Sequence, residues 1–532
     1  FYIITVSCTF ILLFNSFNSI EEVREILRRK IENRHNNTLS IGDELIYSIY
    51  SLPKFYEKRI YLPAWSNPDN IEQLIFSLKS SVKEGLNPED YHFESIVRLF
   101  GNFNKLNNSQ KAELDLIATD AFLLYTSHLL SGKVNPESID PEWYVSRREG
   151  DPVELLKSAL NKNAVKQAVQ ESIPRHNVYQ GLKKALSKYD KIFQQGGWKS
   201  IPEGETLKKG MENERIKLIR DRLIASEDLP GNNSANPNLF DEILLKAIKR
   251  FQENCGLYPD GEIGNSTIAA MNISAESRIN QIKVNLERWR WLPKEYSNYY
   301  IKVNIANYTL EIFKNGKKER IHKAIVGKDY RRTPVFSSKI TYLVLNPTWT
   351  VPPGILNADV LPAVRKNVNY LKTKNLTVYD RDGNPVDLST VDWYSQTVKT
   401  YTYRQPPGPD NALGAVKFMF PNKFNVYIHD TPSKELFNKS ERSLSSGCVR
   451  VQDPLEMAEF LLNDSDNWNL DRIKKYILTK KSLTIQLKEQ PFVHILYWTA
   501  WTNDAGVVQF RKDIYERDGA VIKSINSDPP TL

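Results

Sequence analysis

The chain has 532 residues, of which 41% are hydrophobic and 25% charged, a composition typical of a folded protein with large cores. The 72 Lys and Arg residues outnumber the 63 Asp and Glu residues, but they form no basic block, which argues against nucleic acid as a partner. The only cysteines are Cys8, Cys255 and Cys448. They provide no disulfide framework and no zinc-ligand spacing with histidine, so we expect neither a metal nor another cofactor.

Residues 1–20 carry no charge, and their dense apolar part of about 14 residues is shorter than the roughly 20 that span a bilayer. We interpret this segment as an export signal or an uncleaved membrane anchor, which predicts a periplasmic or cell-envelope location. A lipoprotein site at Cys8 is a weak match because Thr5 replaces an aliphatic residue. The alternative is a buried strand or helix. We expect contact with the membrane only through this segment.

Residues 40–213 are predicted to form a helical scaffold domain, since stretches such as EQLIFSLKSSVKEGL carry apolar residues three and four positions apart. They contain no cluster of catalytic side chains. His92, His128 and His176 stand alone in the sequence, and we interpret each as a structural histidine.

Residues 214–274 are predicted to form a compact unit with two amphipathic helices followed by RFQENCGLYPDGEIGNSTIAAMN. This pattern resembles the small three-helix peptidoglycan-binding domain. The residues that carry the resemblance are Arg250, Phe251, Gln252, Gly256, Leu257, Asp260, Gly261, Gly264 and Thr267. The alternative is a helical linker, and we interpret Cys255 as a packing residue.

Residues 296–522 are predicted to form a mainly β domain, because YYIKVNI, KITYLVLN and NKFNVYIHD alternate apolar and polar residues. Residues 352–405 interrupt this pattern with a polar, helical stretch, which we interpret as a cap inserted over one face. Near the end, two apolar runs flank Asn503–Gly506 and predict a hairpin.

A candidate nucleophile lies in SLSSGCVRV, where Cys448 follows a run of small polar residues. A thiol becomes a useful nucleophile when a base or a positive dipole favours its thiolate. If residues 423–429 form a strand, Tyr427 and His429 share one face, and the following loop is long enough to bring Cys448 to His429. After Cys448, Asp453 and Pro454 predict a helix start with a capping box. The alternative is a buried cysteine with a structural histidine.

HDTPSK followed by SSGCVRV resembles the catalytic signature of the YkuD-type L,D-transpeptidases. The helical scaffold, the peptidoglycan-binding unit, the NLERWRWLP bridge and the inserted cap are similar to the large periplasmic, YcbB-like members of that family. The resemblance covers most of residues 40–520. It predicts an α+β multidomain protein with a mainly β catalytic domain.

The resemblance implies a role for each matching residue. Cys448 is the expected nucleophile and His429 the general base, while Gly447 and Cys448 donate backbone N–H groups to the oxyanion, beside Tyr427. Many smaller relatives have a histidine at the position of Ser446. In the family, the backbone carbonyl of the residue at this position orients the catalytic histidine, here expected to be His429.

Two further residues are candidates for contact with the substrate. Arg450 either binds a substrate carboxylate or braces the turn that carries the cysteine, and Trp349 either lines a donor cleft or packs.

The resemblance also implies the reaction. The thiolate attacks a tetrapeptide stem of peptidoglycan, D-alanine leaves, and the amine of a second stem forms a 3–3 cross-link. Carbapenem β-lactams are the expected covalent inhibitors. Two alternatives stay open: an L,D-carboxypeptidase in which water replaces the acceptor, and a wall-binding scaffold without catalysis.

Overall fold

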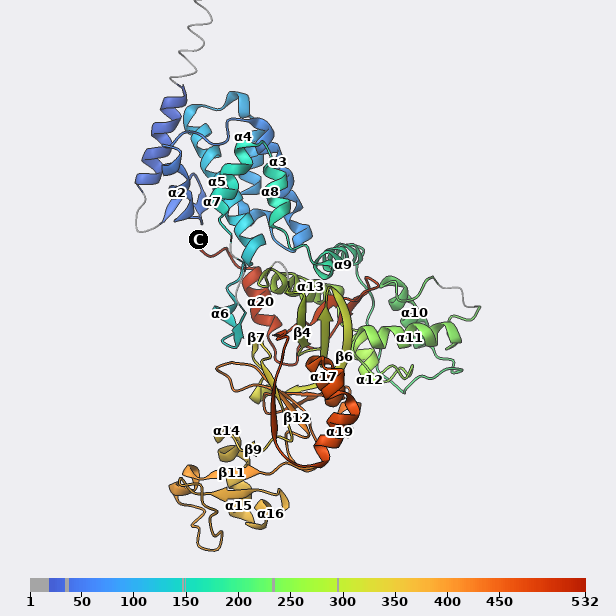
Figure 1. Ribbon diagram of the computed structural model, residues 1–532. Helices are drawn as coiled ribbons and strands as arrows, with labels where there is room; N and C mark the ends of the chain where they lie inside the picture. Colours follow the sequence, from blue (N-terminus) through green and yellow to red (C-terminus); the bar gives the residue numbers. More distant parts are fainter. Residues whose placement is uncertain (1–18, 34–37, 146–147, 149, 232–234, 294–295) are drawn as a thin grey trace, which may run out of the picture.

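The computed structural model describes residues 19–33, 38–145, 148, 150–231, 235–293 and 296–532. Residues 1–18, which hold Cys8 and most of the predicted signal or anchor, lie outside this part of the chain. Figure 1 shows an elongated molecule in which an N-terminal helical region, a central sheet domain and a small cap follow one another, with a helical unit at the side. Among the described residues, we find no helix of the length and apolar character that crossing a bilayer requires.

The N-terminal region is a helical bundle around α5, whose apolar residues are buried on all sides. A helix at 19–32 and a two-stranded hairpin pack against it. The elements of this region are β1 (Leu39–Ile41), β2 (Glu44–Ile46), α2 (Ser51–Lys58), α3 (Pro68–Lys79), α4 (Phe93–Phe100), α5 (Asn108–Ser131), α6 (Pro136–Ile139), α7 (Pro152–Asn161) and α8 (Val165–Ser172), with short 3-10 turns at Ser80–Glu84, Pro88–Tyr91 and Phe103–Lys105.

Two elements inside the predicted helical domain 40–213 belong with the central sheet instead. The strand β3 (Trp143–Tyr144) pairs in parallel with β7 and forms an edge of that sheet. The helix α9 (Asn177–Gln194) contributes its buried face to the core of the sheet domain, where it contacts α13. At the other end of the chain, Leu532 returns to the N-terminal region and exchanges backbone hydrogen bonds with Tyr47 and Tyr50. No local sequence pattern predicts these three contacts, because in each of them the two contacting segments are far apart in the sequence.

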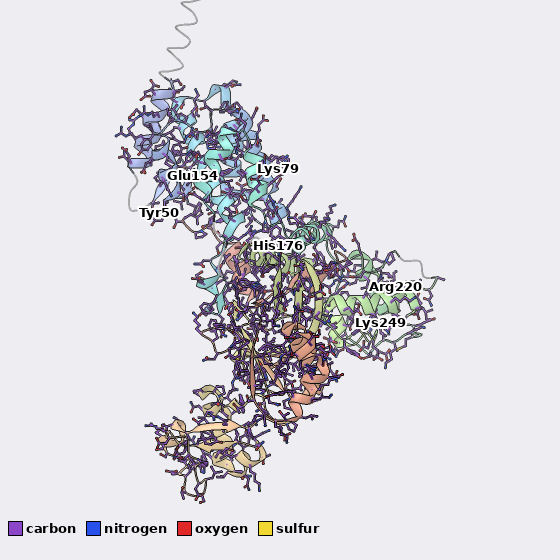
Figure 2. All side chains as sticks on the ribbon, in the orientation of Figure 1. Tyr50, Lys79, Glu154, His176, Arg220 and Lys249 are labelled. Atoms are coloured by element: carbon purple, nitrogen blue, oxygen red, sulfur yellow. The ribbon has the colours of Figure 1, made fainter. Side chains whose placement is uncertain are left out.

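The side unit contains the three expected helices, α10 (Glu214–Ala225), α11 (Glu242–Asn254) and α12 (Asn265–Met271), around a core of its own. This core also includes Ile201 and Leu207, so the unit begins before residue 214, where the prediction placed its start. Figure 2 labels Arg220 and Lys249 on this unit, away from the central sheet, and His176 at the start of α9.

The central domain is built on a 12-stranded mixed sheet with the order β16-β8-β12-β13-β15-β6-β5-β4-β17-β7-β3, to which β14 pairs through β6. The α+β class predicted from the sequence is confirmed. Its strands are β4 (Tyr299–Asn304), β5 (Thr309–Lys314), β6 (Lys317–Gly327), β7 (Val335–Lys339), β8 (Tyr342–Leu345), β12 (Val416–Met419), β13 (Ile428–His429), β14 (Ser443–Ser445), β15 (Val449–Val451), β16 (Leu483–Gln486) and β17 (Phe492–Leu496).

Helices cover this sheet, and the predicted hairpin forms between β18 (Ala500–Thr502) and β19 (Val508–Phe510). The helix α13 (Ala275–Arg290) lies between the sheet and the N-terminal region, where Arg288 pairs with Asp518 at 2.6 Å and Trp289 stacks on Trp498. The remaining helices are α17 (Pro454–Leu462), α18 (Ser465–Trp468), α19 (Leu470–Leu478) and α20 (Asp518–Ile525).

The cap is a separate small body with its own hydrophobic core at the far end of the molecule (Figure 1). It combines short helical segments with a three-stranded sheet, so the helical cap predicted at 352–405 is helical only in part. The strand β9 at its entry and the strand β11 at its exit pair with each other and with β10, which a local reading of the polar insertion does not reveal. Its elements are β9 (Trp349–Thr350), α14 (Pro353–Ile355), the π-helical segment η5 (Leu356–Val360), α15 (Leu361–Lys366), α16 (Asn369–Thr373), β10 (Thr377–Tyr379), the 3-10 turn η6 (Gln396–Thr400) and β11 (Thr402–Gln405).

Candidate active site

The turn that carries Cys448 connects β14 to β15 and is stabilised by hydrogen bonds of the Ser445 side chain within the turn itself. The hydroxyl of Ser445 donates to the carbonyl of Cys448 at 2.6 Å and accepts from the amide of Gly447 at 3.1 Å. Gly447 has φ +114°, a conformation that side chains rarely adopt, which explains the glycine before the cysteine. The parallel pairing of β13 with β15 then sets Val449 beside Ile428 and places Cys448 next to Tyr427.

The Cys448 thiol is half-buried and donates to the carbonyl of Asn425 at 3.8 Å. Burial raises the pKa of this thiol above its usual value, and hydrogen bonds from the backbone N–H and the hydroxyl of Tyr427 oppose that rise. The thiol is therefore protonated at neutral pH. It needs a neighbouring base before it can act as a nucleophile.

His429 has the tautomer and the protonation state of such a base. Its Nδ1 lies at hydrogen-bond distance from the carbonyl of Asp430, and since a carbonyl only accepts, Nδ1 carries the proton and Nε2 keeps its lone pair. Burial, followed by the positive charge of Arg450, lowers the pKa of His429 to about 3. The imidazole is neutral at physiological pH.

The side chain of Asp430 fixes the backbone that orients this histidine. One carboxylate oxygen accepts from the amide of Ala415 at 2.8 Å and the other from the amide of Thr431 at 2.6 Å. The prediction that the carbonyl of Ser446 orients His429 is therefore wrong for this chain, because the carbonyl of Asp430 already occupies Nδ1.

Tyr427 and His429 lie side by side as predicted, with ring centroids 5.5 Å apart, but the strand that was to present them is much shorter than 423–429. Asn425 has φ +55°, and the side chain of Asn422 accepts from the amides of Phe424 and Val426. This local hydrogen bonding replaces a strand ladder with a turn. The turn ends where β13 begins, so the two rings still project together.

The amide of Gly447 is not a free oxyanion donor, contrary to the prediction, because the hydroxyl of Ser445 already accepts from it. Among the described residues, the amide of Cys448 has no acceptor. The Tyr427 hydroxyl lies close to the sulfur, and burial followed by the charge of Cys448 raises its pKa, so it remains a donor. The amide of Cys448 and the hydroxyl of Tyr427 are thus the two donors in place for an oxyanion.

The prediction of a capping box after the motif is also wrong. The helix α17 begins at Pro454 as expected, but Asp453 adopts the left-handed conformation and its side chain makes no capping hydrogen bond. The chain leaves β15 too abruptly for Asp453 to reach the amide of Glu456.

Cys448 and His429 open onto a cleft of about 570 Å³ between the sheet domain and the entry of the cap. Trp349 lines the cleft from the cap side. Arg450 lies half-buried in the wall, and its Nε is buried without a partner in the described part of the chain. Of the two roles open for Arg450, substrate binding therefore fits better than bracing of the turn.

The cleft contains one feature that the sequence analysis missed. Arg331 donates from Nη1 to the hydroxyl of Ser446 at 3.0 Å and pairs through both terminal nitrogens with Asp359 of the cap, at 2.6 and 2.9 Å. Ser446 therefore serves as an anchor for Arg331. No motif marks Arg331 or Asp359, and only the approach of the cap to the cysteine turn reveals them.

The arrangement as a whole suits acyl transfer to a thiol. It combines a thiol, a neutral imidazole, two hydrogen-bond donors and a half-buried guanidinium in one cleft. Within the residues that the structure describes, no three His, Cys, Asp or Glu side chains gather in a way that holds a metal ion.

Three family models match separate parts of the chain. Residues 298–475 match an L,D-transpeptidase catalytic domain (YkuD), residues 50–186 a scaffold domain, and residues 212–271 a "Putative peptidoglycan binding domain". The curated relative described as "Putative L,D-transpeptidase" from Haemophilus influenzae is 36% identical over 258 residues, which are 48% of this chain and 52% of that protein. The chain thus spans about half the length of this relative.

Solved structures of the same catalytic type are similar only at low identity. An L,D-transpeptidase fragment from Xylanimonas cellulosilytica is 14% identical with a TM-score of 0.19, covering 56% of this chain and 99% of the other. The L,D-transpeptidase LdtMt1 in complex with imipenem is 13% identical with a TM-score of 0.19, covering 37% of this chain and 59% of the other.

Proposed function

We propose that the protein is an L,D-transpeptidase of the YkuD type, because residues 298–475 match that catalytic domain, and that it forms 3–3 cross-links between peptidoglycan stems through an acyl-enzyme on Cys448. The observation that carries the proposal is the pairing of a protonated thiol with a neutral buried imidazole in one cleft. A thiol with a raised pKa reacts only if a base takes its proton, and His429 is the base that faces the cleft.

In the first half of the reaction, Nε2 of His429 takes the proton of Cys448 as the sulfur attacks the carbonyl of the third stem residue. The amide of Cys448 and the hydroxyl of Tyr427 stabilise the oxyanion. When the intermediate collapses, the carbon–nitrogen bond breaks and His429 returns the proton to the amine of the departing D-alanine. A thioester remains on Cys448.

In the second half, the side-chain amine of another stem attacks this thioester. His429 takes a proton from the attacking nitrogen, the carbon–sulfur bond breaks, and the thiolate of Cys448 is released and protonated again. The side-chain amine is that of the diamino acid at the third stem position. The new amide bond is the cross-link.

Arg450 is proposed to hold a carboxylate of the donor stem. Its side chain lies half-buried in the cleft wall, and its Nε is buried without a partner among the described residues, so it gains from an anionic ligand. Trp349 is proposed to form the apolar side of the same groove.

The three-helix unit is proposed to hold the protein on glycan or stem, with the body in the periplasm and the segment 1–20 as its export signal or anchor. Carbapenems are proposed to acylate Cys448. The adduct should map to the peptide that contains Cys448 and to no serine.

An L,D-carboxypeptidase uses the same nucleophile, and only the acceptor differs. The cap favours transfer, because a body with its own core adds an enclosing wall beside the thioester, which simple trimming does not need. A scaffold without catalysis is disfavoured by the intact set of Cys448, His429 and Tyr427.

The test is mass spectrometry of muropeptides after incubation of the purified protein with tetrapeptide stems. We expect 3–3 linked dimers as the major product and tripeptides as the minor one. Replacing residues 352–404 by a short glycine-serine linker should shift the balance toward tripeptide or lower both products. Tripeptide as the sole product of the intact protein, even at high acceptor concentration, would establish the carboxypeptidase instead.

A further inference from the structure

A second cavity, of about 300 Å³, lies where the three-helix unit meets α9, α13 and the β18–β19 hairpin. It shares no lining residue with the catalytic cleft. Its apolar walls are Tyr189, Phe251, Val508 and Phe510. We call it the junction cavity.

One side of the junction cavity carries two buried guanidinium groups. Arg222 is 2% exposed, and its Nε donates to the carbonyl of Met271 at 2.9 Å, whereas its Nη1 is buried without a partner among the described residues. Arg278 is 4% exposed and donates from Nη1 to the side chain of Gln281 at 2.9 Å. Within the described part of the chain, neither arginine has a carboxylate within ion-pair distance. The two guanidinium groups lie over the rings of Trp198 and Phe510, at 3.5 and 4.2 Å from the ring centroids, and an anionic ligand would supply the ion pair that both lack.

The lining of the cavity also includes a carboxylate. The carboxylate of Asp228 accepts from the hydroxyl of Ser226 at 2.5 Å and from the side-chain amide of Asn254 at 3.4 Å. Among the described residues, this carboxylate has no Lys or Arg partner within 4 Å. Its neighbour Glu227 differs, because it pairs with Lys188 at 2.9 Å. The cavity thus contains two guanidinium groups that can bind an anion and a carboxylate that can bind a cation.

We propose that the junction cavity binds the zwitterionic end of a peptidoglycan stem peptide, an amino acid that carries both a free carboxylate and a free ammonium group. The carboxylate lies against Arg222 and Arg278, and the ammonium group against Asp228. The cavity is at the small end of the usual range for ligand sites, about 300–1,000 Å³, so it admits a peptide terminus and excludes a glycan strand. The choice of a stem peptide as ligand rests on the proposed function.

The site has a consequence for the whole molecule. The residues that line the cavity come from the three-helix unit and from the sheet domain. A bound stem therefore contacts both units and holds the peptidoglycan beside the catalytic domain. Because the stem binds only where the two units are in contact, its binding free energy stabilises that contact.

Cys255 provides a local probe, because it lines the junction cavity and lies outside the catalytic cleft. The experiment uses the full chain with Cys448→Ala and a synthetic tripeptide that ends in a diamino acid. The rate at which iodoacetamide alkylates Cys255 is followed by peptide mapping at pH 9, since burial raises the pKa of this thiol. We expect saturating tripeptide to slow this reaction more than tenfold. Peptides amidated at the terminal carboxylate or acetylated at the side-chain amine should protect far less.

Variants locate the effect. Arg278→Gln should raise the tripeptide concentration needed for protection at least tenfold, and Arg278→Lys should raise it less. Asp221→Asn, on an exposed position of α10 outside the cavity, should leave it unchanged. Val507→Trp, which fills the rim from an exposed position, should abolish protection without touching either arginine.

Unchanged alkylation of Cys255 at millimolar tripeptide would overturn the inference. Cross-linking by the wild-type protein separates the two proposals. Cross-linking without protection would reject the junction site alone, whereas protection without cross-linking would support the site and reject the proposed reaction.

Discussion

Two buried histidines show how the N-terminal region and the catalytic domain use one residue type in opposite ways. In the N-terminal region, His92 lies between Glu44 and Asp120, at 2.8 Å from each carboxylate. Burial alone would lower its pKa, but hydrogen bonds to Asp120 and Glu44 outweigh burial and raise the pKa to about 9. For His429, burial has no carboxylate to oppose it, and burial together with the positive charge of Arg450 lowers the pKa to about 3. Neighbouring charge therefore separates a structural cation from a neutral base.

The largest effect should come from removing the group that His429 serves. Cys448→Ala should lower cross-linking by at least about 10⁴-fold, since no other group in the cleft can form the acyl-enzyme. Cys255→Ala is the matched control and should leave activity near the wild-type level. Intact-protein mass after incubation with a carbapenem provides the check, and an adduct on the Cys448→Ala protein would contradict the assignment.

Replacing the two histidines should separate their roles. His429→Gln should slow acylation by about 10²–10⁴-fold, the usual contribution of a general base, without a large change in stability. His92→Gln should leave the acylation rate of the folded protein unchanged. The measurement is the pre-steady-state rate of thioester formation, and equal losses in the two variants would remove the distinction between them.

The stability of the N-terminal region should depend on pH through His92. Its pKa is raised on folding, from about 6.5 to about 9, so its contribution is complete below pH 6.5 and disappears as pH rises through 9. The wild-type protein should exceed His92→Gln in free energy of unfolding, and this difference should shrink by on the order of 3 kcal/mol between pH 6 and pH 10. Urea titrations at both pH values measure this, and Glu44→Gln should reduce the difference. A loss that grows with pH would contradict the ion pairs.

The pH profile of acylation should report the charge beside His429. Because its pKa is lowered to about 3, the base form persists to low pH, and the acid limb of the profile should lie well below pH 6.5. Arg450→Gln removes the positive charge that contributes to this lowering, so the limb should move to higher pH. Lys439→Gln, an exposed change on the same loop, should leave it in place. An acid limb near pH 6.5 in the wild-type protein would contradict the lowered pKa of His429.

The smallest effect should come from the contact between cap and cysteine turn. Arg331 and Asp359 are partly exposed, and such pairs contribute at most about 1 kcal/mol, so Arg331→Met should lower kcat/KM by less than about fivefold. Exchanging the charges in a double variant, Arg331→Asp with Asp359→Arg, should recover part of the loss. Full activity in Arg331→Met would show that the pair does not couple the cap to the turn.

The sequence by itself predicted the order of the domains, a candidate nucleophile and a candidate base. Periodicity indicated helices around α5 and strands such as β4, because burial imposes the same spacing wherever these elements pack. The order of His429 and Cys448, with the glycine that permits φ +114°, was enough to indicate thiol chemistry. These signals are local, and they survive although the strand before His429 is broken by a turn.

Tertiary structure alone decided the rest, because those features depend on contacts between residues distant in the chain. It placed β3 at the edge of the sheet, gave the cap a sheet through β9 and β11, and joined Arg331 to Asp359. It also set the two histidine pKa values, since each depends on charges contributed by other elements. The free amide of Cys448 and the engaged amide of Gly447 are likewise consequences of how one turn folds against its neighbours.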